Sequence, residues 1–447
     1  MKIKLRKGLD IKLAGEAKDS DVVDVEPRVY AVIPDDFPGL SAKVDVSEGD
    51  SVKVGSKILH DKKYPEICLV SPVSGRVKAI VRGERRKILR VEIESDGKAT
   101  QLWSDREASP VDKIPALGVL CRAGLFAQMR RRPFDVIPRP DVKPRDIFVT
   151  AIDSAPLATS LVERLGTDAA AYLGAGVKTL KKLTSGNVYL SVGKDWNLGN
   201  IDEATIVEIE GPHPAGNVGI QIANISPIGK GDEVWTLDVV TLYRIGRLMK
   251  DGYVDTSAIV ALTGPEVEVP TLLRTIAGAS IPSLVDGRLK SGAHHQRIIS
   301  GNVLTGIKVD PDDGFLHFPW RQITVIAEGD DVDEFIGWAS LSPKKLSFSR
   351  TFPFRRLRKT FSPDARLFGG RRAMIMSGEY DRVMPADIMV EYLLKAIIGK
   401  NIEDMEALGI YEIAPEDVAL CEFVDTSKLP VQRIVRDGLD ALRKEVE

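Results

Sequence analysis

The residues that could carry redox or metal chemistry are few and widely separated in this chain. Its three cysteines are Cys68, Cys121 and Cys421. An iron–sulfur cluster held by thiolates usually needs four such ligands, and three widely spaced cysteines do not form a disulfide framework. The sequence therefore predicts no iron–sulfur cluster and no resident metal ion.

The histidine with the most distinctive context is His213, in the run G-P-H-P-A-G from Gly211 to Gly216. A neutral imidazole can donate and accept a hydrogen bond near pH 7, so His213 is a candidate donor to a carbonyl group or a proton relay. The alternative is that the run forms a rigid turn that positions two strands. The adjacent His294 and His295 lack metal-ligand spacing. No Ser–His–Asp order or paired-carboxylate motif indicates hydrolysis, so we predict no catalytic residue.

A basic–aromatic segment extends from Ser347 to Phe361 and interleaves aromatic side chains with five basic residues. Such a segment can lie on anionic lipid headgroups or dock on a membrane-embedded partner, or it can be a loop that covers part of the core. Stacking combined with charge can also bind single-stranded nucleic acid, but a net charge of -2 provides no general basic field for it. Arg355, Arg356 and Arg358 are the candidate membrane or partner contacts.

Length and composition indicate a large globular protein. The 447 residues correspond to about three domains of roughly 150 residues, with 43% hydrophobic and 28% charged residues. No apolar run approaches the ~20 residues that span a bilayer, and the N-terminus lacks the apolar core of a signal peptide. We expect the protein in the cytoplasm or on a membrane surface that faces it.

The first hundred residues predict a module of short strands. The stretches Val44–Leu59 and Ser71–Val77 resemble the barrel-sandwich hybrid of lipoyl and biotinyl carrier domains, with G-D-x-V-x-x-G-x-x-L followed by S-P-V-S-G-R-V. The carrier lysine would align near Tyr64–Pro65, and the neighbouring Lys62 and Lys63 lack the carrier context. We therefore expect a structural β module, with a carrier protein as the alternative.

The rest of the chain predicts an α/β multidomain protein. Between residues 101 and 255 strands alternate with helices, which indicates a Rossmann-like domain. Residues 256–330 are expected to form a small SLBB or β-grasp-like α+β domain, and residues 331–447 a helical domain. Within these regions we expect helices at Ala158–Leu165, Asp168–Leu183, Glu233–Met249 and Thr271–Ala277. The run Arg130–Arg132 is expected to be a solvated face.

Several blocks in the correct order resemble the NqrA family, which is one of the subunits of the bacterial sodium-translocating NADH:quinone reductase. The resemblance covers nearly the full length of the chain. The blocks are Lys7–Asp10, Gly211–Gly219, Gln322–Asp330, Phe335–Trp338, Glu379–Ile388 and Ala407–Val424. This family is itself similar to the subunit of respiratory complex I that binds NADH and flavin.

The resemblance implies a site that has lost its nucleotide. The complex I relative carries a glycine-rich loop whose backbone N–H groups approach phosphate without Cβ clashes. Here the stretch Cys121–Met129 replaces that loop with bulky side chains. We expect no tightly bound flavin or dinucleotide, and we expect quinone as a transient ligand in an apolar cleft. The candidate quinone-binding residues are Phe126, Met129, Phe134 and His213.

The resemblance also implies a role within a larger complex. We expect a peripheral subunit on the cytoplasmic face of the bacterial inner membrane, held there by partner subunits that carry NADH, flavins and iron–sulfur clusters. The complex would transfer electrons from NADH to quinone and drive sodium transport, and the isolated chain would not be catalytic. The alternative within electron transport is an Rnf-type subunit, which needs cysteine cluster motifs that the three isolated cysteines cannot supply.

Overall fold

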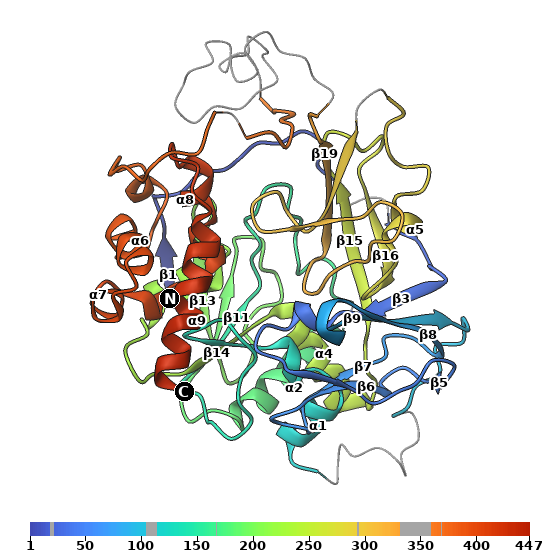
Figure 1. Cartoon of the computed structure of the whole chain (residues 1–447). Helices are drawn as coiled ribbons and strands as arrows, with labels where there is room; N and C mark the ends of the chain where they lie inside the picture. The colour runs from blue at the N-terminus through green and yellow to red at the C-terminus, as the bar shows by residue number, and fades with distance from the viewer. Residues whose placement is uncertain (18–21, 104–113, 167, 293–294, 331–358, 368) are drawn as a thin grey trace.

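The computed structural model describes residues 1–17, 22–103, 114–166, 168–292, 295–330, 359–367 and 369–447. Within this part of the chain, a β module, an α/β region, a second mixed sheet and a group of C-terminal helices pack together (Figure 1). The α/β multidomain class expected from the sequence is confirmed. No helix among the described residues is both long enough and apolar enough to cross a membrane.

A six-stranded sheet forms the centre of the α/β region. Its order is β1-β13-β12-β11-β14-β10, and all neighbours pair in parallel except the antiparallel β10 and β14. The strands are β1 (Lys2–Lys4), β10 (Arg130–Arg132), β11 (Ile147–Thr150), β12 (Val188–Val192), β13 (Ala204–Glu210) and β14 (Val234–Asp238). Chain order and spatial order reverse between β11 and β14, as in doubly wound sheets.

Three helices cover the two faces of this sheet. α2 (Ala169–Lys181) and α4 (Val239–Asp251) pack into one apolar cluster, and α3 (Val218–Ile225) packs on another. The helix expected at Glu233–Met249 is wrong at its start, because Val234–Asp238 is the buried strand β14. Its valine, tryptophan and threonine favour a strand. Asp238 then caps α4 by accepting a hydrogen bond from the N–H of Thr241 at 2.7 Å.

The helix expected at Ala158–Leu165 is also wrong, since this segment forms turns. The preceding Leu157 has a left-handed backbone with φ of 63°, which a continuous right-handed helix does not accommodate. Leu161 and Val162 nevertheless point into the apolar core. Their spacing therefore reflects burial of an irregular segment and not helical periodicity.

The β module consists of two small antiparallel sheets. One has the order β3-β9-β8-β5 and the other β4-β6-β7. The strands are β3 (Val29–Val32), β4 (Ala42–Val44), β5 (Ser51–Val52), β6 (Lys57–Asp61), β7 (Cys68–Val70), β8 (Gly75–Arg82) and β9 (Ile88–Ser95). Short 3₁₀ turns η1 (Pro34–Asp36) and η2 (Glu84–Arg86) follow β3 and β8.

A second six-stranded sheet has the order β18-β17-β19-β15-β16-β2. Its strands are β2 (Val22–Asp24), β15 (Ser257–Thr263), β16 (Thr271–Ile276), β17 (Gln296–Ser300), β18 (Ile307–Val309) and β19 (Gln322–Ala327), with helix α5 at Ile281–Val285. The helix expected at Thr271–Ala277 is wrong, because Thr271–Ile276 pairs with β15 along its whole length. A short apolar run cannot distinguish a helix from a buried strand, and here pairing with β15 decides.

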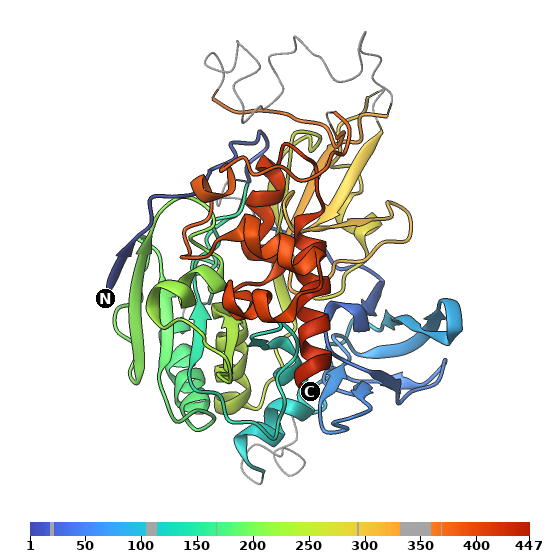
Figure 2. The same ribbon diagram turned by 60° about the vertical axis from the view of Figure 1, so that its left-hand side comes forward.

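The C-terminal helices are α6 (Val390–Ile398), α7 (Ile402–Ala407), α8 (Ala419–Val424) and α9 (Val431–Val446). They enclose a second apolar core that reaches β13 and α3, and Figure 2 shows them in red in front of the rest of the fold. The start of the chain joins the other regions: β1 pairs with β13, and β2 pairs with β16. The first two strands therefore pair with sheets outside the β module.

Candidate functional site

The segment that stands in place of a glycine-rich loop is compact and buried. Helix α1 (Ala116–Arg122) is followed by the 3₁₀ turn η3 (Phe126–Gln128). Phe126 and Met129 are fully buried, and the Phe126 ring meets the Trp235 ring edge-on with centroids 5.3 Å apart. Two of the four predicted quinone contacts therefore face the core beneath the sheet.

The residues around these two buried side chains line a cleft, here called the junction cleft. It has a volume of about 90 Å³ and lies where the β module, the α/β region and the second mixed sheet meet. Its walls include Phe37, Leu125, Gln128, Arg244, Leu316 and Phe318. Gly124, with φ of 74°, also lines it, and a Cβ there would approach the Val70 side chain to 3.1 Å.

An aromatic pair with a guanidinium above it borders the junction cleft. The rings of Phe37 and Phe318 stack with centroids 5.2 Å apart, and the Arg130 guanidinium lies 5.9 Å from each ring. Next to them, His317 Nδ1 lies 2.6 Å from Asp36 Oδ1. Burial raises the pKa of Asp36 although His317 opposes the shift.

Arg244 supplies the strongest hydrogen-bond donor in the junction cleft. It comes from α4, is buried, and donates from Nη2 to the carbonyl oxygen of Ser257 at 2.6 Å. Its Nε is buried and has no hydrogen-bond partner in the described part of the chain. Burial lowers the pKa of the guanidinium, which still remains charged at neutral pH. An unpartnered donor in an apolar cleft is an unusual feature in a folded protein.

The His213 turn lies at the carboxyl edge of the parallel sheet, after β13. The backbone N–H of Gly216 donates to Ser154 Oγ at 2.7 Å, and this hydroxyl lies 3.0 Å from His213 Nδ1. The backbone N–H of His213 donates to Asp10 Oδ1 at 2.9 Å. Burial lowers the pKa of His213 to about 4, so the imidazole is neutral at pH 7 with a hydroxyl partner at Nδ1.

Phe134 and His213 lie apart from the other two predicted quinone contacts. Phe134 packs in the core of the C-terminal helices, with the Arg131 guanidinium 5.2 Å from its ring. Arg436 on α9 donates to the Phe134 carbonyl oxygen at 2.7 Å. Phe126 and Met129 belong instead to the first apolar cluster. The structure therefore divides the four predicted residues between two sites.

The crevice where a doubly wound sheet usually binds its ligand contains side chains. This crevice lies beyond the carboxyl ends of β11 and β14, where the strand order reverses. Arg321 from the second mixed sheet region pairs there with Asp238, at 2.5 Å between Nη1 and Oδ2. Gln322 donates to the carbonyl oxygen of Pro156, which follows β11. A nucleotide in the usual position would have to displace these contacts.

Comparison with known proteins agrees with this architecture. Family models match the NqrA N-terminal barrel-sandwich hybrid domain at residues 3–96, the NqrA second alpha/beta domain at 113–254 and the NQRA C-terminal domain at 259–310. The NqrA protein of the Na(+)-translocating NADH-quinone reductase of Serratia proteamaculans is 38% identical over 451 residues, which covers 99% of this chain and 100% of the relative. This chain belongs to the NqrA family.

Other family members give the same result. The corresponding protein of Yersinia pestis bv. Antiqua is 36% identical and that of Klebsiella pneumoniae subsp. pneumoniae 34% identical, each over 99% of this chain and the whole relative. A solved chain of NAD+-reducing [NiFe]-hydrogenase in the H2-reduced state matches with a TM-score of 0.36 and 13% identity, over 68% of this chain and 55% of that chain. This last likeness is too low to support an argument. The family expected from the sequence is confirmed.

The cysteines of this family member are poor metal ligands. Cys68, Cys121 and Cys421 are all buried and unpaired. Burial raises the pKa of Cys121 to about 12, and it also raises the pKa values of Cys68 and Cys421. A thiol must lose its proton to bind a metal. Among the described residues, no group of three or more His, Cys, Asp or Glu side chains could hold a metal ion.

The remaining predicted residues are in two places. Lys62 and Lys63 occupy the turn between β6 and β7, where Asp61 Oδ1 accepts hydrogen bonds from the backbone N–H groups of Lys63 and Tyr64. Family membership favours the structural β module over the carrier alternative. Arg355, Arg356 and Arg358 lie outside the described residues.

Sequence reasoning missed most of the residues that line the junction cleft. Gln128 lies within the stretch Cys121–Met129, but Phe37, Arg244 and Phe318 come from three distant parts of the chain. The only local signal is the apolar composition around Leu125, which alone does not show which side chains face a cleft. The structure brings these residues together through packing of the three regions.

Proposed function

We propose that this chain is a peripheral component of a sodium-translocating NADH:quinone reductase and contributes to quinone binding and to assembly of the complex. Its relatives carry the name of that complex along their whole length. In this proposal NADH, flavins and iron–sulfur clusters are bound by partner subunits, which also hold the chain at the cytoplasmic face of the inner membrane. The contribution of this chain is positioning, and electron transfer takes place elsewhere.

The buried, unpartnered Nε of Arg244 in the junction cleft is the observation that carries the quinone proposal. A quinone head group is flat and weakly polar, and its two carbonyl oxygens accept hydrogen bonds. A cleft with aliphatic and aromatic walls and a few donors suits such a group. Leu125, Phe37 and Phe318 supply the walls, with Phe126 and Met129 packed in the core behind the loop.

The volume of the junction cleft sets a requirement for binding. At about 90 Å³ it is smaller than the ~150 Å³ cavity that accommodates benzene in an engineered protein. Binding of a quinone ring therefore requires the walls to move apart. The walls come from three regions that meet through side-chain contacts, so small shifts between the regions can widen the cleft.

The assembled complex allows a direct test with Arg244→Met. A hydrogen bond to a charged group contributes about 1.5–3 kcal/mol, so we expect the quinone KM to rise roughly tenfold or more. Reduction of an artificial acceptor by NADH should not change. Arg247→Met is the matched control, because Arg247 lies one turn further along α4 and pairs with Asp255 at 2.8 Å. An unchanged quinone KM in the Arg244 variant, or an equal rise in the control, would contradict the proposal.

Photo-crosslinking with a quinone analogue distinguishes the two sites to which the predicted residues belong. Labels on residues 31–37, 123–128 or 316–318 would support the junction cleft. Labels on residues 211–219 would instead support His213 as the donor. Labels confined to the C-terminal helices would refute both assignments.

The purified chain is expected to be colourless and to contain no stoichiometric flavin or iron. This expectation rests on the buried side chains Phe126 and Met129 in the degenerate loop and on the filled crevice between Asp238 and Arg321. Absorption spectra and metal analysis after gentle purification provide the measurement. One equivalent of flavin or of iron–sulfur cluster per chain would refute this part of the proposal.

A further inference from the structure

A second concave surface lies on the β module and shares no lining residue with the junction cleft. It has a volume of about 470 Å³, within the range of roughly 300–1,000 Å³ typical of small-molecule sites. Its cationic side chains come from β4, from the β6–β7 turn and from the hairpin between β8 and β9. We call it the basic groove, and these cationic residues are Lys43, Lys62, Arg82, Arg85, Arg86 and Lys87.

The charge in the basic groove is strongly one-sided. Six basic side chains face a single carboxylate, that of Asp35, which leaves a formal excess of five positive charges. The whole chain, in contrast, carries a net charge of -2. Like charges gathered around one concavity repel each other, and the arrangement is favourable only when an anion neutralises it.

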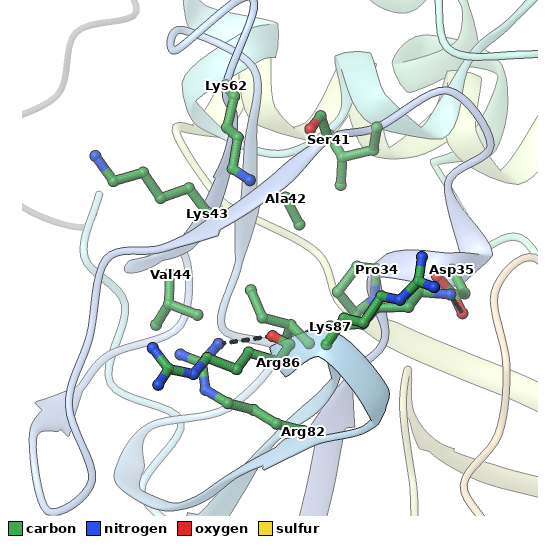
Figure 3. A pocket seen from close by; sticks show the side chains of 13 residues that line it. Pro34, Asp35, Ser41, Ala42, Lys43, Val44, Lys62, Arg82, Arg86 and Lys87 are labelled. Carbon is green, nitrogen blue, oxygen red and sulfur yellow. Dashed lines mark hydrogen bonds and ion pairs between the residues drawn. The ribbon is translucent and has the colours of Figure 1, made fainter.

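Few of these cations have a partner within the protein. Lys87 Nζ pairs with Asp35 Oδ2 at 2.6 Å, and Arg82 Nη1 donates to the carbonyl oxygen of Arg86 at 3.2 Å, the dashed line in Figure 3. The side chains of Lys43, Lys62, Arg85 and Arg86 make no hydrogen bond or ion pair with other described residues. Figure 3 shows Lys62 and Arg86 on opposite sides of the strand segment that carries Ala42 and Val44.

The hairpin that carries the arginines has a strained backbone. Arg85 and Arg86 both adopt left-handed conformations, with φ of 53° and 60°. Hairpin turns with two left-handed residues strongly favour asparagine, aspartate or glycine. Arginine at both positions is less favourable for folding than these residues. The charge of the side chains is therefore a better explanation of the sequence here than the turn geometry.

We infer that the basic groove binds a small anion with two adjacent phosphate groups, such as the pyrophosphate of a nucleoside diphosphate. One phosphate carries only about 1.5–2 negative charges, so it would leave most of the cationic excess unmatched. Two linked phosphates match it better, and guanidinium groups bind phosphate oxygens in pairs. The half-buried side chains of Leu40, Val44 and Ile88 complete the lining and give an apolar surface for the organic part of the ligand.

Calorimetric titration of the full chain at physiological salt tests this inference, with pyrophosphate, ADP and inorganic phosphate as probes. We expect saturable binding of one pyrophosphate per chain and weaker binding of inorganic phosphate. Tighter binding of ADP than of pyrophosphate would identify a nucleotide as the ligand, and the reverse an inorganic one. Absence of saturable binding of either up to about 1 mM, or equally tight binding of inorganic phosphate, would overturn the inference.

The double variant Arg85→Asn with Arg86→Asn sharpens the test. Asparagine suits the left-handed positions better than arginine, so this variant should fold at least as well as the natural chain. We expect its affinity for pyrophosphate to fall at least about tenfold, because two charge-assisted contacts are lost. The control removes two positive charges from the same module outside the groove, by Lys53→Asn with Lys98→Asn. Equal affinities in the double variant and the natural chain would refute the assignment.

Discussion

Replacement of Arg132 by methionine should lower the free energy of unfolding by about 3–5 kcal/mol, the range for breaking a buried ion pair from one side. The Arg132 side chain is only 2% exposed and lies on β10. It pairs with Glu416 at 2.7 Å and with Asp417 at 3.1 Å, both from the C-terminal region. Burial opposes its charge, but the neighbouring carboxylates outweigh burial and raise the pKa of the guanidinium. The variant leaves those carboxylates without a cation.

The loss of stability in this variant should depend on pH. Burial raises the pKa of Asp417, while Arg132 opposes the shift, so removal of Arg132 raises that pKa further. An acid whose pKa is higher in the folded state than in the unfolded state favours folding when protonated and loses that advantage as pH rises. The difference between variant and natural chain should therefore be larger at about pH 7 than at about pH 5.

Denaturant unfolding at the two pH values provides the measurement, with Arg433→Met as the control. Arg433 forms an exposed pair with Asp437 on α9, at 4.0 Å, and exposed pairs contribute only about 0–1 kcal/mol. A loss below about 1 kcal/mol in the Arg132 variant, or a loss that grows as pH falls, would show that the buried pair does not hold the C-terminal helices as we describe.

Replacement of Gly246 by alanine should also destabilise the protein, by about 1–3 kcal/mol or more. Gly246 lies on α4 where this helix crosses α2, and a Cβ there would stand 1.8 Å from the backbone carbonyl oxygen of Tyr172. Backbone atoms cannot move aside as a flexible side chain can, so the two helices would have to separate. Both helices bury leucine side chains, Leu173 and Leu242 among them, in the first apolar cluster, and separation would loosen that packing.

Gly174→Ala is the matched control on the opposite helix. Gly174 lies within α2, and no atom stands within 4 Å of a Cβ added there. Alanine is favoured over glycine in a helix interior by about 0.5–1 kcal/mol, so this variant should be more stable than the natural chain. Thermal unfolding of the two variants compares them directly. If Gly246→Ala were as stable as Gly174→Ala, the close approach of α2 and α4 would be wrong.

The sequence by itself identified the family and the order of the main regions. Motif blocks such as Gly211–Gly219 lie in the right order along the chain, and this order does not depend on knowing the fold. Strands with clear alternation were also predictable: the pattern at Leu89, Val91 and Ile93 became β9. These features are local, because a strand with one buried face repeats every two residues.

Only the tertiary structure decided which residues share a site. The junction cleft combines Phe37, Gln128, Arg244 and Phe318, and no local pattern relates residues so far apart in sequence. The predicted contacts Phe126 and Met129 lie in the core beside that cleft, since a 3₁₀ turn directs neighbouring side chains to different sides. Whether they and His213 affect quinone binding stays a prediction.

Two other features show why local patterns were insufficient. The run Arg130–Arg132 was expected to be solvated, yet Arg131 and Arg132 are buried, because carboxylates more than 280 positions later in the chain neutralise Arg132. Thr271–Ile276 was expected to be helical, yet pairing with β15 makes it a strand. A buried charge and a short strand both depend on partners from elsewhere in the chain, and the tertiary fold alone brings those partners together.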